Sequence, residues 1–387
     1  MTPPQIENFT KDEVEFIRIH SDSNQPFIHA RREVLHAIAC RKKIKTKLPS
    51  WFKHCDIVYP ESIALEQASS EQTAAYKAQL LSGQRLLDLT GGFGVDDYYF
   101  SKKFDEVFYV EQQEKLAQLV AMNFTTLGIR NIQCFNKEAT VFLQEDSGNY
   151  DVIYLDPARR NTAGKKTFLF EDCTPNILTI TSTLWQKTSC ILLKASPLFD
   201  IQQASSLLQG LKEVHVVSIQ NECKEILFLL EKGYHGDYVV RAIDLTLPEQ
   251  AFHCSYLQEK QCVIEFDKPY RYIFEPNAAI MKTGAFKTLA NKFGLKKIHP
   301  NTHLFTNEFP VPNFPGRCFE LIQIIKPQSK YLKAILPEMK ANLILRNFPG
   351  SAIDLKKKLG IKDGGDSYLL ACTNTDNSKI LLHCNRI

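Results

Sequence analysis

The 387-residue sequence contains no apolar run long enough to cross a membrane, and its N-terminus lacks the basic and then apolar pattern of a secretory leader. Its 11 cysteines are scattered and odd in number, with no C-x-x-C pair, so neither a disulfide framework nor a zinc ribbon is indicated. Internal repeats and low-complexity segments are also missing. We therefore expect a soluble protein of the reducing cytoplasm.

Charge is unevenly placed along the chain, although the net charge is only +4. Residues 31–53 hold 8 basic residues against 1 acidic residue, and residues 282–387 hold 17 against 7, so the rest of the chain is acidic by 13 charges. Basic ends around an acidic middle favour a polyanionic partner that the ends would bind. The alternative is that these basic residues only form solvated helix faces. The length suits two or three domains.

A strand–turn–helix–strand pattern runs through residues 85–111. A short apolar strand ends at Asp88, the glycine turn Gly91-Gly92-Phe93-Gly94 follows, and a second strand ends before Glu111. Glycines let a backbone approach a ligand closely, and a carboxylate after the second strand lies where a ribose diol would bind. A dinucleotide motif would have glycine at position 97, where this chain has Asp97, so the acidic helix start suits a cationic cofactor better.

This unit resembles the cofactor motif of class I S-adenosylmethionine-dependent methyltransferases. The resemblance implies that the glycine loop faces the methionine part of S-adenosylmethionine and that Glu111 binds the ribose. It also implies that Glu138, after a third strand at 132–135, accepts a hydrogen bond from the adenine amino group. The alternative for the glycine loop is an ordinary turn that binds nothing. For Glu138, an acid after a strand is common and does not by itself indicate a ligand. The implied cofactor-binding residues of this unit are Asp88, Thr90, Gly91, Gly92, Gly94, Glu111, Gln112, Glu138 and Ala139.

Residues 1–82 have the pattern of a helical cap that precedes the first strand. Near its end, Ser70 is placed to cap a helix that has Thr73 in its first turn. The segment resembles the lid that several RNA methyltransferases fold over the cofactor, which makes Ser70 and Thr73 further candidates for cofactor binding. A plain capping motif explains both residues equally well. The neighbouring candidates for lid contacts are Glu66, Gln67 and Ser69.

A second motif, Asp156-Pro157-Ala158-Arg159, follows the buried strand 152–155. Ligands of α/β sheets bind at the carboxyl ends of the strands, which is where this motif lies. The motif resembles the catalytic tetrad of amino-methyltransferases, in which Asp, Asn or Ser is followed by Pro-Pro and an aromatic residue. The resemblance implies catalytic roles for Asp156, Pro157 and Arg159, with Asp156 orienting the nucleophile.

The motif departs from that tetrad at two positions. Ala158 replaces the second proline, and Arg159 replaces the aromatic residue. An arginine can still stack on a base or hold a phosphate, and Phe168 or Phe170 in the following loop could supply an aromatic platform. The alternative for Asp156-Pro157 is a turn that only ends a strand.

Strands at 190–193, 214–219 and 226–230 continue the pattern, and the last two are joined without a helix between them. Five strand–helix units followed by an antiparallel hairpin predict an α/β fold with the Rossmann-like sheet of class I methyltransferases. Lys194, after the first of these strands, and Glu222, in the hairpin connection, would face the substrate or form a surface pair.

From about residue 237 the pattern changes to that of a small α+β module, which we expect to be ferredoxin-like. It contains strands at 238–245 and 261–266 and a helix that begins at Glu275-Pro276 and runs to Ala290. Two histidines at 299 and 303 have a spacing that metal sites use, but Pro300 and Asn301 between them break the helix that would aim both at one ion. We therefore expect no metal.

The C-terminal part predicts strands at 318–325, 341–347, 367–373 and 379–383 and helices at 330–339 and 351–359. Its segments 346–349 and 362–366 resemble the THUMP-like domain appended to a bacterial methyltransferase family, and THUMP domains proper bind RNA. The predicted domains are a helical cap (1–82), a methyltransferase domain (83–236), a ferredoxin-like module (237–312) and a THUMP-like domain (313–387).

These features predict a cytoplasmic S-adenosylmethionine-dependent methyltransferase that modifies a base of structured RNA, tRNA or rRNA, and needs no metal. Asp156 would orient the nucleophile beside the cofactor. Two alternatives stay open. One is a methyltransferase that acts on a protein or a small molecule, and the other is a non-catalytic RNA-binding relative.

Overall fold

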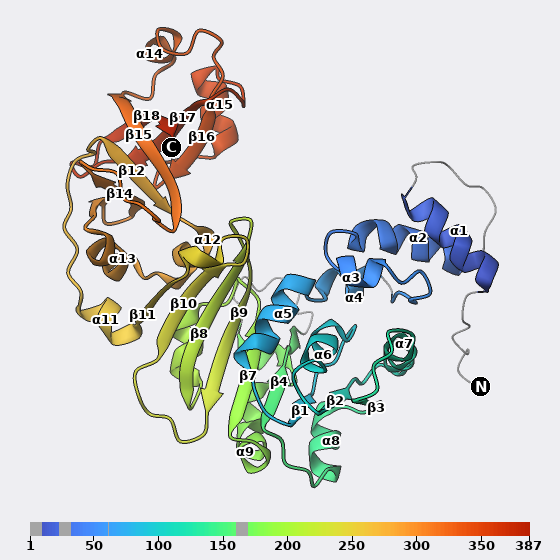
Figure 1. The fold of residues 1–387 in the computed structure, drawn as a ribbon. Coiled ribbons are helices and arrows are strands. Elements are labelled where there is room, and N and C mark those ends of the chain that lie inside the picture. Colours follow the sequence, from blue (N-terminus) through green and yellow to red (C-terminus); the bar gives the residue numbers. More distant parts are fainter. Residues whose placement is uncertain (1–9, 23–31, 61, 160–168) are drawn as a thin grey trace. The chain divides into compact units, whose positions relative to one another are not determined.

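The computed structural model of the protein describes residues 10–22, 32–60, 62–159 and 169–387 (Figure 1). The chain divides into two units, residues 1–212 with 227–235 and residues 213–226 with 236–387. Among the described residues, no helix is both long and apolar enough to span a membrane.

A nine-stranded sheet carries the predicted Rossmann-like topology. Its strand order is β3-β2-β1-β4-β7-β9-β8-β10-β11, and β3, β2, β1, β4 and β7 run parallel. Gln220 and Asn221 join β8 to β9 with positive φ angles of 52° and 61°, the backbone geometry of a tight hairpin turn. The predicted sheet with a final hairpin is confirmed. Its first seven long strands are β1 Arg85–Asp88, β2 Glu106–Val110, β3 Ile132–Phe135, β4 Val152–Leu155, β7 Cys190–Ala195, β8 Leu211–Ile219 and β9 Glu222–Glu231.

Helices connect the parallel strands, and their apolar faces explain why the strands are apolar throughout. Leu87, Val107 and Ile153 of the neighbouring strands β1, β2 and β4 are fully buried. Gly94 of the glycine loop has a φ of 72°, and a Cβ there would lie 2.7 Å from the ring of Phe124 in helix α7. Only glycine therefore fits between the loop and α7. The helices are α6 Val95–Phe100, α7 Glu114–Thr126, α8 Ala139–Glu145, α9 Ile177–Lys187 and α10 Ile201–Leu207.

The N-terminal part is helical, as predicted, and packs against the glycine loop of the same unit. The Trp51 side chain is fully buried, with its ring centroid 5.1 Å from that of Phe93 and 5.7 Å from that of Tyr98. Asn123 of α7 exchanges two hydrogen bonds with the Val58 backbone, at 2.8 and 2.9 Å. The helices are α1 Lys11–Asp22, α2 Arg32–Ile44, α3 Pro49–Phe52, α4 Ser62–Gln67 and α5 Glu71–Leu80.

Two further strands extend the sheet, which differs from the sequence-based prediction. β10 (Val239–Asp244) pairs in parallel with β8, and β11 (Phe252–Ser255) pairs antiparallel with β10. We expected β10 within the small module, and the sequence did not predict β11. The predicted strand at 261–266 is wrong, because residue 261 ends helix α11 (Tyr256–Gln261) and only an isolated bridge at Phe266 follows.

A seven-stranded sheet, of order β13-β14-β12-β15-β18-β17-β16, forms most of the rest of the second unit. Ile273 and Leu304 share one buried cluster with Phe319 and Leu382, so the two C-terminal parts predicted as separate modules share a core. The strands are β12 Tyr272–Pro276, β13 Lys296–His299, β14 Thr302–Asn307, β15 Gly316–Ile325, β16 Asn342–Arg346, β17 Ser367–Thr373 and β18 Lys379–Arg386.

The predicted helix from Glu275 to Ala290 is wrong at its start and at its middle. Glu275 and Pro276 end β12, and the Asn277 side chain caps the helix that follows by accepting from the Ile280 N–H at 3.0 Å. Gly284, with a φ of 73°, then ends that helix. The helices are α12 Ala278–Thr283, α13 Phe286–Phe293, α14 Ser329–Lys333, which is shorter than predicted, and α15 Ala352–Leu359.

Candidate active site

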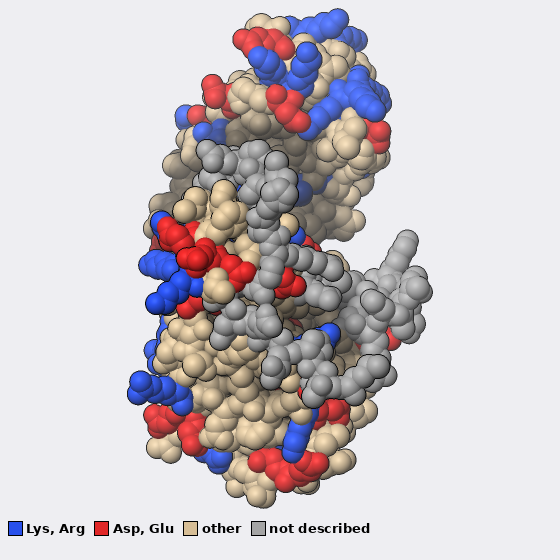
Figure 2. Space-filling model, turned by 90° about the vertical axis from the view of Figure 1, so that its right-hand side faces the viewer, with Lys and Arg blue, Asp and Glu red and all other residues tan. Residues whose placement is uncertain are grey.

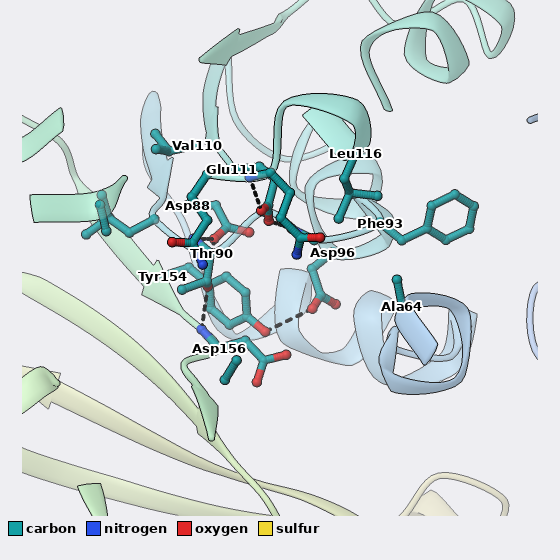
Figure 3. Close-up of a pocket in the computed structure, with 18 of the residues that line it drawn as sticks. Ala64, Asp88, Thr90, Phe93, Asp96, Val110, Glu111, Leu116, Tyr154 and Asp156 are labelled. Atoms are coloured by element: carbon teal, nitrogen blue, oxygen red, sulfur yellow. Dashed lines mark hydrogen bonds between the residues drawn. The ribbon is translucent and has the colours of Figure 1, made fainter. Parts of the chain in front are cut away.

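A cavity of about 180 Å³ lies at the carboxyl ends of β1, β2 and β4, within the first unit (Figure 3). Residues from the segment before β1, the glycine loop and the starts of α7 and α8 line it. The predicted residues that reach it are Asp88, Thr90, Gly91, Gly92, Gly94, Glu111, Gln112, Glu138, Ala139 and Asp156. Gln67 and Ser69 also line the cavity, whereas Ser70, Thr73 and Pro157 do not.

Glu111 shapes the glycine loop. Its Oε2 accepts a hydrogen bond from the Gly92 N–H at 3.1 Å, and its Oε1 accepts one from the Gln113 N–H at 2.8 Å. The Tyr109 hydroxyl donates to the Gly92 carbonyl at 2.7 Å, and a Cβ on Gly91 would lie 2.2 Å from the Tyr109 ring. Tyr109 of β2 and Glu111 just after β2 therefore both hold the loop, and Glu111 is buried at the cavity wall.

Asp88 and Thr90 connect the loop to the second motif. The Asp88 Oδ1 accepts from the Thr90 N–H at 2.7 Å and from the Thr90 hydroxyl at 3.1 Å. The Thr90 hydroxyl oxygen in turn accepts from the Asp156 N–H at 2.6 Å (Figure 3). One hydrogen-bonded chain thus fixes Asp156 relative to the strand that carries the glycine loop.

Three buried aspartates make this site electrostatically unusual. Burial, with the charges of Asp96 and Asp156 nearby, raises the pKa of Asp88 to about 8. Burial and the neighbouring Asp88 and Asp96 raise the pKa of Asp97 well above its ordinary value. Burial also disfavours ionised Asp96, but the Lys77 and Lys194 charges and two hydroxyl hydrogen bonds outweigh it and lower its pKa.

Lys77 forms a buried network that the sequence analysis missed. Its side chain is fully buried, with Nζ 3.2 Å from the Asp96 Oδ1 and 3.0 Å from the Ser69 Oγ. Ser69 donates to the Asp96 Oδ2 at 2.8 Å. The Tyr154 hydroxyl donates to the same oxygen at 2.9 Å (Figure 3). The signal was present in the spacing, because Thr73, Ala74, Lys77 and Ala78 lie on one buried face of α5.

Asp156, just after β4, forms an ion pair with Lys194 of the neighbouring strand β7. From the sequence we expected Lys194 and Glu222 to face the substrate or to form a surface pair. Lys194 pairs with Asp156 instead, and Glu222 pairs with Lys224 at 2.7 Å. Lys194 was therefore an informative position whose partner could not be assigned from the sequence.

The chain beyond Pro157 forms a short strand, β5 (Ala158–Arg159), that pairs with β6 (Cys173–Thr174). The Arg159 side chain and Phe168 lie outside the described part of the structure. Phe170, in a 3-10 turn (Phe170–Asp172), is buried, with ring centroids 4.9 Å from Phe199 and 6.0 Å from Phe228. The expectation that Phe170 offers a stacking platform is wrong, because its ring belongs to the core.

Three other predicted residues cap helices. Ser70 and Thr73 form a reciprocal capping box at the start of α5, with the Ser70 Oγ accepting from the Thr73 N–H at 3.2 Å. Glu138 caps α8, because its Oε2 accepts from the N–H groups of Thr140 and Val141 at 3.1 and 3.2 Å. Glu138 also lines the cavity, whereas the other two residues do not.

Neither histidine of the 299–303 segment belongs to a metal cluster. The His303 ring stacks on the Phe286 ring at 4.0 Å between centroids, and the His299 Nε2 lies 3.1 Å from the Asn377 Oδ1. Within the ranges that the structure describes, no three His, Cys, Asp or Glu side chains are grouped to hold a metal ion.

Two family models match the C-terminal part of the chain. One, described as a ferredoxin-like domain, matches residues 272–315, and the other, described as THUMP domain-like, matches residues 316–386. A comparison with curated proteins gave no match.

A solved structure resembles the chain over nearly its whole length. It is the crystal structure of a candidate methyltransferase from Porphyromonas gingivalis W83, which is 29% identical with a TM-score of 0.87, and the match covers 98% of this chain and 100% of that one. The protein therefore has the fold of a class I methyltransferase with C-terminal ferredoxin-like and THUMP-like domains.

Two partial likenesses are much weaker. A candidate methyltransferase from Streptococcus mutans in complex with SAH is 15% identical over 42% of this chain and 96% of its own, with a TM-score of 0.32. A 16S rRNA methyltransferase from T. thermophilus in complex with AdoMet and guanosine is 14% identical over 45% of this chain and 44% of its own, with a TM-score of 0.33. Neither supports a conclusion about activity.

Proposed function

We propose that the protein is an S-adenosylmethionine-dependent methyltransferase that acts on structured RNA, tRNA or rRNA. The carrying observation is the cavity at the carboxyl ends of β1, β2 and β4, where the side chains of Asp88, Asp96, Glu111 and Asp156 meet around a glycine loop (Figure 3). Open α/β sheets bind their ligands at this edge. The carboxylates of Asp96, Glu111 and Asp156 in this lining suit a cationic cofactor.

The lining residues fit S-adenosylmethionine. A Cβ on Gly92 would meet only the Thr90 carbonyl oxygen, at 3.7 Å, so the loop backbone faces open space that a ligand can approach. Gly92 and Glu111 would hold the ribose side, and Glu138 with Ala139 would hold the adenine side. When bound, the cofactor supplies a methyl group that its sulfonium already activates. The protein then has to orient the acceptor and exclude water.

Asp156 is the residue that we assign to the acceptor. Its backbone is fixed by Thr90, and its carboxylate is fixed by Lys194, so the side chain is held at the cavity before any ligand binds. A carboxylate in that position can accept a hydrogen bond from the nucleophilic atom of an RNA base. Pro157 and Arg159 would shape the surface beside it.

The RNA substrate is proposed from the C-terminal domain. That region matches a THUMP-like family model, and its helices α14 and α15 carry exposed lysines. Figure 2 shows Lys and Arg side chains gathered at the C-terminal end, with acidic groups between them. The exposed lysines of and beside these two helices are Lys326, Lys330, Lys333, Lys357, Lys358 and Lys362. Such a surface attracts phosphates.

The test is transfer of radiolabelled methyl from S-adenosylmethionine to total RNA from a strain that lacks this gene. We expect label in RNA with the wild-type protein and none with Asp156→Ala, while calorimetry gives similar cofactor affinity for both. Label in protein or small molecules only would reject the RNA substrate. RNA binding without cofactor binding would identify the protein as a non-catalytic relative.

A further inference from the structure

Lys194 and Asp156 form an ion pair at the cavity edge. Leu193 and Leu155 are directly paired in the parallel strands β7 and β4, so the next residues, Lys194 within β7 and Asp156 just after β4, lie side by side. The Lys194 Nζ bonds the Asp156 Oδ2, with side-chain exposures of 13% and 36%. The fold therefore places an ammonium group beside the carboxylate that we assign to the acceptor.

Lys194 also interacts electrostatically with a second carboxylate, that of Asp96. The Lys194 charge helps to lower the pKa of Asp96, against the burial that would raise it. Asp96 is also held by Lys77, at 3.2 Å, and lines the cavity. Lys77 and Lys194, which lie behind the cavity lining, thus hold two carboxylates that line it, those of Asp96 and Asp156.

Acceptor chemistry distinguishes two kinds of nucleophile. An exocyclic base amine needs hydrogen-bond acceptors for its protons, and a cation beside the carboxylate only weakens that acceptor. A hydroxyl or a ring N–H must lose its proton as it attacks, and a nearby cation stabilises the negative charge that develops on it. A lysine–aspartate pair supplies both a proton acceptor and a positive charge.

We propose that Lys194 positions Asp156 and stabilises an acceptor atom that becomes negatively charged, so that the methyl group goes to a ribose hydroxyl or a ring N–H and not to an exocyclic amine. This inference rests on the proposed function and names its acceptor. Position 159 holds arginine where the tetrad of amino-methyltransferases has an aromatic residue that stacks on the base, and this departure agrees with the inference.

The acceptor proton moves to the Asp156 Oδ1, the acceptor electron pair forms the bond to the methyl carbon, and the carbon–sulfur bond breaks with its electron pair left on sulfur. The products are the methylated acceptor and a neutral thioether. Asp156 then releases the proton to solvent, and Lys194 keeps its protons throughout.

The first test identifies the methylated atom. Full-length protein and methyl-labelled S-adenosylmethionine are added to an extract of a strain that lacks this gene, and RNA, protein and small-molecule fractions are analysed separately. We expect label on a ribose oxygen or a ring nitrogen of RNA. Label on an exocyclic amine or on carbon in RNA would overturn the inference and keep the proposed function.

Label outside RNA would overturn the proposed function, and the acceptor atom found there, oxygen or ring nitrogen against amine or carbon, would still decide the inference. No label in any fraction would overturn both.

The second test replaces the lysine. Lys194→Met should lower kcat by about 100-fold, the order seen when one charge-stabilising group is removed, while cofactor affinity by calorimetry stays within about twofold. Lys194→Arg should restore part of kcat. The rise of kcat with pH should move to higher pH in Lys194→Met, because the anionic acceptor loses its stabilising charge.

The control removes a lysine from a more exposed ion pair that lies outside the cavity lining. Lys212 pairs with Glu231 at 2.5 Å, and neither residue lines the cavity. Lys212→Met should leave kcat and its pH profile unchanged. Wild-type kcat and pH profile in Lys194→Met would overturn the role of Lys194.

Discussion

Asp88 and Asp97 are carboxyl groups with 1% and 0% exposure inside the first unit. The pKa of Asp88 rises to about 8 and that of Asp97 rises as well, in both cases mainly because burial disfavours the charged form. Between the unfolded pKa near 4 and these raised values, the folded state keeps protons that the unfolded state has lost. Stability therefore falls as pH rises through this window.

Asp97→Asn tests that dependence, because it removes one of the two groups. We expect the free energy of unfolding to fall less steeply between pH 5 and pH 8 in the variant than in the wild type, measured by urea denaturation at each pH. Asp105→Asn, at an exposed position, is the control and should keep the wild-type slope. Equal slopes in all three proteins would show that Asp97 does not titrate in this range.

Glu111 offers a second residue-level prediction, which concerns cofactor binding. Both of its oxygens accept backbone N–H groups of the loop and of the turn after β2, so Glu111→Ala frees the loop and removes the proposed ribose contact. We expect S-adenosylmethionine to bind about 1.5–3 kcal/mol more weakly in calorimetry. Glu114→Ala, on the exposed start of α7, should bind normally. Wild-type affinity in Glu111→Ala would remove this assignment.

Residues on strand ends could be predicted from the sequence, whereas their partners could not. Asp88, Glu111 and Asp156 follow apolar strands, and parallel strands bring their carboxyl ends to one edge, so a local pattern was enough to place them. The contact between Lys77 and Asp96 joins a helix before β1 to the helix after it. Such a pair depends on tertiary packing, which no single window of sequence contains.

At the scale of elements, α5 is attached to the methyltransferase sheet through a buried charge. Lys77→Met leaves Asp96 without its ion pair in a buried position, so we expect the free energy of unfolding to drop by about 3–5 kcal/mol in urea denaturation. The same variant should bind S-adenosylmethionine more weakly, because Ser69 at the cavity loses its lysine partner.

An exposed lysine of the same region provides the comparison. Lys43 pairs with Glu66 at 3.1 Å, with side-chain exposures of 55% and 63%. Because water screens such a pair, Lys43→Met should cost less than about 1 kcal/mol. Similar losses in the two variants would mean that the buried pair does not anchor α5.

Regular elements in the first unit were easier to predict than those after residue 237. Strand β3 has the predicted bounds, 132–135, because its apolar residues mark it locally. Pro276 suggested a helix start, but the residue ends a strand and Asn277 supplies the cap. The proline signal was ambiguous because its fixed φ is compatible with both a first helical turn and a strand end.

At the scale of the whole molecule, the shared seven-stranded sheet decides how RNA binding should be tested. β12 lies between β14 and β15, and its Ile273 packs in one cluster with Phe319. Removal of residues 316–386 would leave β12 paired with β14 alone and would expose that cluster, so a loss of binding would not identify the binding surface. Surface substitutions that leave the sheet intact are the sharper test.

Lys333 of α14 and Lys357 of α15 are both exposed on helices that contact each other. If they bind phosphates, the variant with serine at both positions should bind structured RNA more weakly. Its slope of log affinity against log salt should be shallower by about 1.4–1.8, because two phosphate contacts are lost and fewer counterions are released on binding. Exposed Lys103 and Lys115 of the first unit, replaced in the same way, form the control. Only a localised contact makes the two pairs of lysines unequal. A salt slope that becomes equally shallow in both variants would therefore show that RNA binding depends on overall charge and not on this surface.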